Sequence, residues 1–320
     1  MKFSTSIAVA ALAELAFCAP TRISKRQSSE GPVGYASLNG GTTGGQGGSE
    51  TTVSDLDAFI EAVGSDSAAI VYVSGTVSGS ESVYVTSDKS ILGLNSDSRL
   101  DGVGLYIKEA NNVIVQNLAI SNVLADNNDA IGIQESTNVW IDHCDLSSNM
   151  EHDKDYYDGL LDITHASDYV TVSNTYFHDH WKATLVGHSD DNGEEDTGHL
   201  RVTYANNYFS NINSRTPSIR FGTGHIFNSY YENMDTGVNT RMGAQVMVES
   251  SVFVNVEAPI ESVDSDETGS AVVNDVDLGS GENSAPEGTL TSVEYEYTLL
   301  GSAAVKAAVV GTAGNTLTLG

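Results

Sequence analysis

The chain has 320 residues, of which 43 are Asp or Glu and only 14 are Lys or Arg, so its formal net charge is −29 at pH 7. A nucleic-acid partner is not expected, because binding to phosphate backbones requires a basic surface stripe that so acidic a chain lacks. One of the two cysteines, Cys18, lies in the leader described next, which leaves Cys144 alone. Without an intramolecular disulfide, a secreted protein needs a large self-sufficient core.

The N-terminus has the features of a secretory leader. Residues 1–18 predict a signal peptide, because a charged start is followed by an apolar stretch from Ile7 to Phe17 and then by small residues. The apolar stretch is too short to span a bilayer, so no membrane partner is expected. Residues 19–26 predict a short propeptide that ends at the dibasic pair Lys25-Arg26. We therefore expect a secreted, extracellular monomer with a single mature domain, residues 27–320.

The first element predicted in the mature chain is a short amphipathic helix from Thr52 to Val63, with Ser54 as its N-terminal cap. Its apolar face would cover the first coil of the repeating fold that follows. The members of this face are Leu56, Phe59, Ile60 and Val63.

The middle of the chain repeats one weak pattern: two apolar residues that alternate with variable ones, then usually Asn, and an apolar residue three positions later. Alternation with period two predicts short strands, and the change of phase at the Asn predicts a bend before a second strand. Successive bend positions are 26, 31, 32, 22 and 22 residues apart, which is typical of a β-solenoid whose coils bury apolar residues against their neighbours. We expect Asn side chains to stack from coil to coil at the bend. The bend positions are Asn117, His143, Asn174, Asn206, Asn228 and Ser250.

The residues that make some intervals longer must loop out, and these loops are expected at 121–135, 147–166 and 178–199. Long loops on a rigid scaffold commonly carry function. Near the C-terminus, Ala303 to Val310 predicts a second short helix, which would supply the terminal capping that a solenoid requires.

Three acidic residues in these loops are candidates for a metal site. Asp158 and Asp162 flank Gly-Leu-Leu, and Asp129 precedes the predicted strand 130–133 one coil earlier. Stacked coils would bring the three carboxylates together, where they repel one another unless a cation lies between them. Hard oxygen ligands suit Ca²⁺, although the residues alone also allow a solvated acidic surface.

Four basic residues would lie beside the acidic cluster on successive coils. Arg215 and Arg220 are five positions apart around Pro217, which disfavours a helix. Lys182 lies one coil before Arg215, and Arg241 lies one coil after it. A cleft with a metal site on one wall and a basic row on the other suits a polyanion. The alternative is that the arginines pair with surface acids.

The segment from Val139 to His143 offers further candidates, since Trp140 and His143 could take part in catalysis. The alternation instead places Asp142 and His143 at the bend, which favours a hydrogen-bonded structural role. Cys144 could be a nucleophile, but we interpret it as a small buried side chain.

From roughly Thr52 to its C-terminus the chain resembles the pectate lyases of polysaccharide lyase family 1, of the fungal extracellular type. The resemblance implies an all-β fold, a single-stranded right-handed parallel β-helix with a short N-terminal capping helix. It also implies a carbon–oxygen lyase that cleaves (1,4)-α-D-galacturonan, or polygalacturonate, by calcium-dependent elimination and leaves 4,5-unsaturated galacturonosyl ends. The motifs that carry it are Val139-Trp140-Ile141-Asp142-His143, Arg215-Thr216-Pro217-Ser218-Ile219-Arg220, Asp129-Ala-Ile, and the pair Asp158 and Asp162.

The same resemblance implies a role for each candidate residue. Asp129, Asp158 and Asp162 would be the Ca²⁺ ligands, and Arg215 would be the catalytic base. The residues that would bind substrate carboxylates are Lys182 and Arg220, with Arg241 assisting.

Three alternatives remain open on the residues themselves. A polygalacturonase on the same scaffold would need paired carboxylates and a water, and the candidate pair is Asp190-Asp191, close to His188. A pectin lyase would lack the metal carboxylates and favour an aromatic cleft, whereas this chain has only two Trp. A non-catalytic carbohydrate-binding β-helix would not need the two arginines around Pro217.

Overall fold

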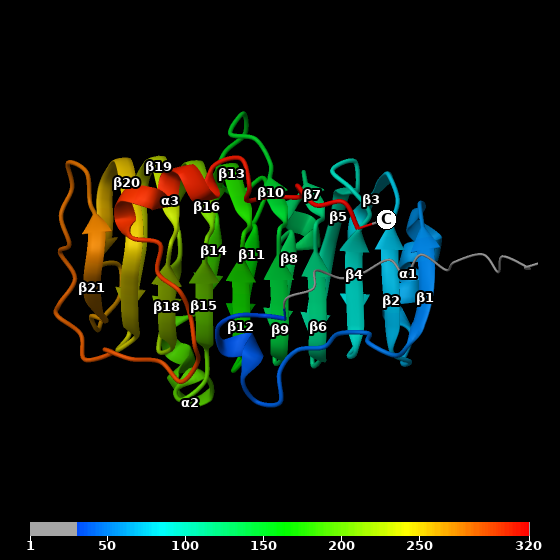
Figure 1. Cartoon of the computed structure of the whole chain (residues 1–320), viewed down its shortest axis with the longest axis horizontal. Helices are drawn as coiled ribbons and strands as arrows, with labels where there is room; N and C mark the ends of the chain where they lie inside the picture. The colour runs from blue at the N-terminus through cyan, green and yellow to red at the C-terminus, as the bar shows by residue number, and fades with distance from the viewer. Residues whose placement is uncertain (1–30, 320) are drawn as a thin grey trace, which may run out of the picture.

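The structure is a computed structural model that describes residues 31–319, so the predicted signal peptide and propeptide lie outside the described residues. In this part of the chain the strands follow one another along a single axis and build a parallel β-helix, which confirms the predicted fold (Figure 1). Between residues 31 and 319, no helix has the length and apolar character that crossing a membrane demands.

The coils contribute their strands to three parallel sheets. The first sheet contains β1 (Ser49–Val53), β2 (Ala69–Val73), β4 (Lys89–Gly93), β6 (Asn111–Gln116), β9 (Thr137–Asp142), β12 (Asp168–Ser173), β15 (Arg201–Ala205), β18 (Thr223–Phe227), the start of β20 (Gln245–Glu261) and β21 (Ser270–Asp277). The second contains the first parts of β3 (Thr76–Val85) and β5 (Arg99–Lys108), then β7 (Ala119–Ser121), β10 (Asp145–Ser147), β13 (Tyr176–Lys182), β16 (Tyr208–Ser214), the start of β19 (Tyr230–Arg241) and the middle of β20. The third contains the later parts of β3 and β5, then β8 (Ile131–Gln134), β11 (Leu161–Thr164), β14 (Thr184–Val186), β17 (Ser218–Arg220) and the ends of β19 and β20.

The predicted bend between the first and second sheets is present at all six positions. Each of these residues has a positive φ, from 45° at Ser250 to 57° at Asn117, and Asn is one of the residues that adopts this left-handed conformation most readily. The predicted Asn ladder forms only in part. Asn228 Nδ2 donates to Asn206 Oδ1 (3.0 Å), whereas Asn117 Nδ2 donates to the carbonyl of Leu317 in the C-terminal segment (3.0 Å).

The space between the three sheets is filled by apolar side chains in one continuous core. A stack of aromatic rings from four successive coils runs through it, with centroid separations of 4.7, 4.8 and 4.3 Å, and its members are Phe177, Phe209, Tyr231 and Phe253. Cys144 also lies inside with no exposed surface, and burial raises the pKa of its thiol to about 12. The thiol is therefore protonated and enclosed, which confirms the structural interpretation of this cysteine.

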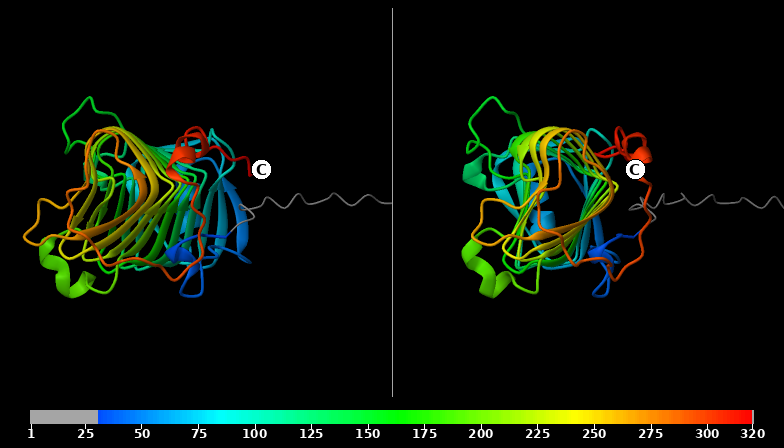
Figure 2. Two further views of the ribbon diagram at one scale, coloured as in Figure 1. Left: turned by 60° about the vertical axis from the view of Figure 1, so that its left-hand side comes forward. Right: turned by 90° about the vertical axis from the view of Figure 1, so that its left-hand side faces the viewer.

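The loops are shorter than predicted, because part of each predicted loop belongs to the third sheet. Strand β8 lies within 121–135, β11 lies within 147–166, and β13 and β14 occupy the start of 178–199. Strands β8, β11 and β14 have only three or four residues. An alternation of apolar and polar residues cannot be recognised in segments this short. Figure 2 shows the remaining loops, in green, on one side of the β-helix, with the N-terminal and C-terminal segments on the other.

Both predicted helices exist, with corrected details. Helix α1 (Leu56–Gly64) begins later than Thr52, and its cap is Asp55 rather than Ser54, since Asp55 Oδ1 accepts from the backbone N–H of Ala58 (3.0 Å). Residues 49–53 instead extend the first sheet as β1. Helix α3 (Ser302–Val309) does not cap the C-terminal end but lies along the outer face of β19 and β20, where its apolar residues pack on Tyr230 and Val252 (Figure 1). The remaining short helices are η1 (Tyr35–Ser37), η2 (Ala125–Asn127), η3 (Asp190–Asn192) and α2 (Gly193–Asp196).

Candidate functional site

All seven predicted site residues lie on or beside the third sheet, distributed over five successive coils. Asp129 immediately precedes β8, Asp158 and Asp162 flank the start of β11, and Lys182 ends β13. The arginines follow on the next two coils, with Arg215 between β16 and β17, Arg220 at the end of β17 and Arg241 at the end of β19. The seven residues therefore form the predicted row along one face of the β-helix, and this row runs parallel to the β-helix axis.

Two of the three predicted metal carboxylates converge on a glycine. The backbone N–H of Gly159 donates to Asp129 Oδ1 (2.9 Å), and that of Leu185 donates to Asp162 Oδ1 (3.1 Å). A Cβ atom on Gly159 would lie 2.5 Å from Asp162 Oδ1 and 2.8 Å from Asp129 Oδ1. The two carboxylates thus meet over bare backbone, because residue 159 carries no side chain.

The electrostatics of this pair are unfavourable in the absence of a cation. Burial, and next the negative charge of Asp158, raises the pKa of Asp129 to about 6. Burial, followed by repulsion from Asp129, raises the pKa of Asp162 well above its usual range. A positive charge between the carboxylates would relieve both effects.

The third predicted ligand, Asp158, has a different partner. Its Oδ1 lies 3.1 Å from Lys182 Nζ, which also lies 3.3 Å from Asp155 Oδ1. As the side chains stand, residues 31–319 contain no group of three or more His, Cys, Asp or Glu placed to hold a metal ion. The predicted triad is therefore two converging carboxylates with Asp158 turned toward Lys182.

The residues nevertheless fit a divalent cation that prefers oxygen. The donors are hard carboxylate oxygens, the type that Ca²⁺ binds in flexible geometry with water to complete its shell. The missing side chain of Gly159 leaves room between Asp129 and Asp162. Burial and mutual repulsion raise the pKa values of both carboxyls even though Arg215 lies close enough to lower them. Asp158 would join the set once its carboxylate leaves Lys182.

Gly159 offers a direct test of this arrangement. We expect Gly159→Ala to weaken Ca²⁺ binding by about tenfold or more, since the new methyl group would displace both carboxylates and tenfold corresponds to only about 1.4 kcal/mol. Isothermal titration calorimetry measures the change. Gly64→Ala is the matched control, because a Cβ there meets no atom within 4 Å. Wild-type affinity in Gly159→Ala would mean that the cation does not bind between these carboxylates.

Arg215 combines a strained backbone with an unengaged side chain. Its φ is +63°, and its carbonyl accepts from the backbone N–H of Thr184 (2.8 Å), which holds the turn in place. Within the part of the chain that the structure describes, its guanidinium makes no hydrogen bond and no ion pair, although it lies close enough to influence the ionisation of Asp129 and Asp162. The same left-handed conformation recurs at the bends of the β-helix, so it is the unengaged guanidinium, and not the turn, that sets Arg215 apart.

Arg220 and Arg241 are both held by Asp190. Arg220 Nε donates to Asp190 Oδ1, and its Nη1 donates to the carbonyl of Gly187 (2.9 Å). Ser265 Oγ donates to the same carboxylate oxygen (2.9 Å) and accepts from Arg241 Nε (2.7 Å). Since Asp190 is occupied by these donors, it does not form the free carboxylate pair with Asp191 that the polygalacturonase alternative requires.

His180 is a contributor that the sequence did not reveal. It is 1% exposed, and burial lowers its pKa to about 4, so the ring is neutral at pH 7. Its Nε2 donates to the carbonyl of Asp158 (2.6 Å), and its Nδ1 contacts Ser148 Oγ. The histidine therefore ties the loop that carries Asp158 to β13. Nothing in the alternation of β13 indicated that residue 180 contacts a loop 22 residues earlier.

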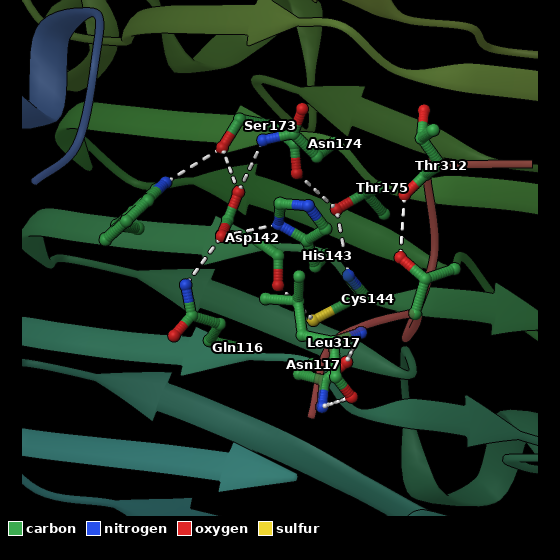
Figure 3. A network of polar contacts seen from close by, with 12 residues as sticks. Gln116, Asn117, Asp142, His143, Cys144, Ser173, Asn174, Thr175, Thr312 and Leu317 are labelled. Atoms are coloured by element: carbon green, nitrogen blue, oxygen red, sulfur yellow. Dashed lines mark hydrogen bonds and ion pairs between the residues drawn. The ribbon is translucent and has the colours of Figure 1, made fainter. Parts of the chain in front are cut away.

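The segment with Trp140 and His143 lies at another corner of the β-helix, where Figure 3 shows a polar network. Asp142 Oδ1 accepts from Ser173 Oγ (2.7 Å) and Asn174 Nδ2 (2.9 Å), and its Oδ2 lies 2.8 Å from His143 Nδ1. Trp140 Nε1 donates to Ser173 Oγ (2.9 Å). The network joins successive coils at the bend, as expected for a structural role.

Comparisons with known proteins agree on one family. A family model described as pectate lyase matches residues 3–317. "Probable pectate lyase A" of Aspergillus niger is 60% identical over 299 residues, 93% of this chain and 92% of that protein. "Probable pectate lyase A" of Neosartorya fischeri is 58% identical and covers 99% of both chains.

Solved structures extend the agreement to the fold. A pectate lyase from a Bacillus species, solved in complex with trigalacturonate, has a TM-score of 0.80 and 33% identity over 89% of this chain and 98% of that one. Pectate lyase II from Xanthomonas campestris has a TM-score of 0.77 and 28% identity, covering 91% of this chain and 100% of its own.

Proposed function

This chain belongs to the pectate lyase family, and we infer that it is a pectate lyase, an enzyme that cleaves polygalacturonate by elimination and leaves 4,5-unsaturated galacturonosyl ends. The structural observation that best supports this function is the unengaged guanidinium of Arg215 beside Asp129 and Asp162. A free arginine next to converging carboxylates, with further cations on neighbouring coils of the same face, suits a chain of sugar carboxylates.

We propose that Ca²⁺ is the cofactor, with Asp129 and Asp162 as ligands and Asp158 as the third. Bound there, the ion would neutralise the C6 carboxylate of the substrate and make the neighbouring C5 proton more acidic. The convergence of the carboxylates over Gly159 supports this assignment.

Side chains of this chain would bind the substrate and take the proton from C5. Lys182 and Arg220 bind substrate carboxylates, and Arg241 assists from the next coil. A nitrogen of the Arg215 guanidine takes the proton from C5, the C5–H electron pair becomes the C4=C5 double bond, and the C4–O bond breaks. The departing oxygen takes a proton from water. Asp190 and Gly187 hold Arg220 in position for this role, which lowers the cost of orienting the substrate.

The site of action and the state of assembly are also proposals. We propose that the enzyme acts outside the cell, because residues 1–26 have the features of a leader and a propeptide and because polygalacturonate is an extracellular polymer too large to enter a cell. We also propose that it acts as a monomer.

One assay tests the reaction and its metal. With polygalacturonate and Ca²⁺ we expect an ultraviolet absorbance from the unsaturated product, which an excess of chelator removes and added Ca²⁺ restores. Reducing ends without absorbance would instead identify a hydrolase. Absorbance that resists the chelator and is greater on methylated substrate would identify a pectin lyase. No turnover on any pectin would leave a carbohydrate-binding β-helix.

A further inference from the structure

Two tyrosines, Tyr84 and the partly buried Tyr106, form an aromatic pair on the outer face of the third sheet. Tyr84 is 63% exposed. Its ring meets that of Tyr106 edge to face, with centroids 4.9 Å apart and planes at 74°. The two residues are register partners on β3 and β5, so neighbouring coils present both rings on the same outer face. An aromatic pair on an outer face commonly marks a binding surface.

The pair continues the row that contains the candidate metal site. Tyr106 pairs in register with Gly132, Gly132 with Asp162, and Asp162 with Leu185. With strands about 4.8 Å apart, Tyr106 lies roughly 10 Å and Tyr84 roughly 15 Å along the axis from Asp162. The tyrosines are therefore on the same face as the site and in its long direction.

Gly132 places no side chain between Tyr106 and Asp129. A Cβ atom on Gly132 would lie 3.3 Å from Tyr106 Cδ2 and 3.6 Å from Asp129 Oδ2. The ring of Tyr106 and the carboxylate of Asp129 therefore both border the bare backbone of Gly132. A polymer that lies along the axis at the metal site would meet the tyrosines next.

The tyrosine pair offers a ring surface, and the charged residues beside it are paired with one another. Lys108, two residues after Tyr106, lies 3.3 Å from Glu135 and 4.0 Å from Glu109, so its charge is already matched. Tyr106 Oη donates to Gln134 Oε1 (2.7 Å), which fixes the ring. The apolar C–H face of a sugar ring matches such a fixed aromatic surface.

We propose that Tyr84 and Tyr106 form a distal sugar subsite, on which a galacturonosyl ring of the bound polymer stacks a few units away from the bond that is cleaved. The proposal rests on the proposed function, because it takes polygalacturonate as the polymer bound along this face. Its consequence is that longer oligogalacturonates gain affinity that trigalacturonate does not.

The test compares chain lengths. Initial rates of unsaturated-product formation are measured for trigalacturonate and hexagalacturonate with the wild type and with Tyr84→Ala/Tyr106→Ala. We expect the ratio of kcat/KM for the hexamer to that for the trimer to fall roughly tenfold in the double variant, mainly through KM on the hexamer. The fall should persist at high salt, because a stacking contact is not screened as an ion pair is.

Three controls make the outcome decisive. Tyr84→Phe/Tyr106→Phe keeps both rings and should keep the wild-type ratio, and Tyr84→Ala alone changes a side chain too exposed to be needed for folding. Leu299→Ala removes another exposed apolar side chain, 42% exposed, on the C-terminal segment. A wild-type ratio in Tyr84→Ala/Tyr106→Ala would overturn the subsite. Failure of the wild type to form unsaturated product from either oligomer would overturn the proposed function, and the subsite with it.

Discussion

Arg215→Gln is expected to lower kcat on polygalacturonate by roughly 10³-fold while changing KM only a few-fold. A positioned general base contributes about 10² to 10⁴ in rate, and glutamine is a shorter polar side chain without a group that can take the C5 proton. The loss should fall on kcat, because Lys182, Arg220 and Arg241 remain to bind the substrate carboxylates.

The pH profile distinguishes a base from a binding residue at this position. Only the neutral form of a guanidine can accept a proton, and this form is scarce at neutral pH because arginine is normally charged. The wild-type rate should therefore rise with pH through the neutral range and reach its maximum in alkaline solution. Arg99→Gln, at an exposed arginine that starts β5, is the control and should keep the wild-type rate and profile. A rate maximum well below neutral pH would rule out Arg215 as the base.

Asp162→Asn is expected to have opposite effects on the metal-free and calcium-bound protein. In chelator at pH 7 the variant should be more stable than the wild type, because it removes one of two partly buried carboxylates that repel each other. In excess Ca²⁺ the wild type should gain stability by mass action, whereas the variant should gain little and should lose activity. Thermal or denaturant unfolding under the two conditions measures both effects.

The raised pKa values determine how the metal-free stability depends on pH. An unfolded Asp ionises near pH 4, whereas folding raises the pKa of Asp129 to about 6 and that of Asp162 in the same direction. Between these values the folded state holds protons that the unfolded state has released, so stability falls as pH rises from about 4 to 6. For Asp129 alone the loss is on the order of 2 to 3 kcal/mol.

Asp162→Asn should reduce this fall, and Asp97→Asn, at an exposed aspartate on the surface, should leave it as in the wild type. If the metal-free wild type became more stable between pH 4 and pH 6, or if Asp162→Asn bound Ca²⁺ with wild-type affinity, the carboxylates would not have the role assigned to them.

The site residues were found in the sequence because each lies next to a local signal. Arg215 and Arg220 flank a proline among few basic residues, and Asp158 and Asp162 flank the start of an apolar strand. Because the bends and strands repeat, residues on successive coils could be placed on one face before the fold was known. Their chemical roles came from the family resemblance, since an acidic loop and an arginine pair are each common on their own.

The contacts that shape the site could not be found in this way. The convergence of Asp129 and Asp162 depends on the missing side chain at Gly159, and the orientation of Asp158 depends on Lys182 and His180, 24 and 22 residues later. The strands of the third sheet were too short to show alternation, which is why the predicted loops were too long. The alignment of Tyr84 with Asp162 similarly depends on the register of several coils.

The sequence by itself determined the repeating architecture, the bends and the order of the candidate residues along the chain. These properties depend on local alternation and on backbone preferences such as the left-handed conformation of Asn. Only the tertiary structure decided which side chains meet, because contacts between coils depend on register and on loop lengths that a period-two pattern does not encode. Three features were decided by the tertiary structure alone: the pairing of Asp158 with Lys182, the convergence of Asp129 and Asp162 over Gly159, and the alignment of Tyr84 and Tyr106 with Asp162.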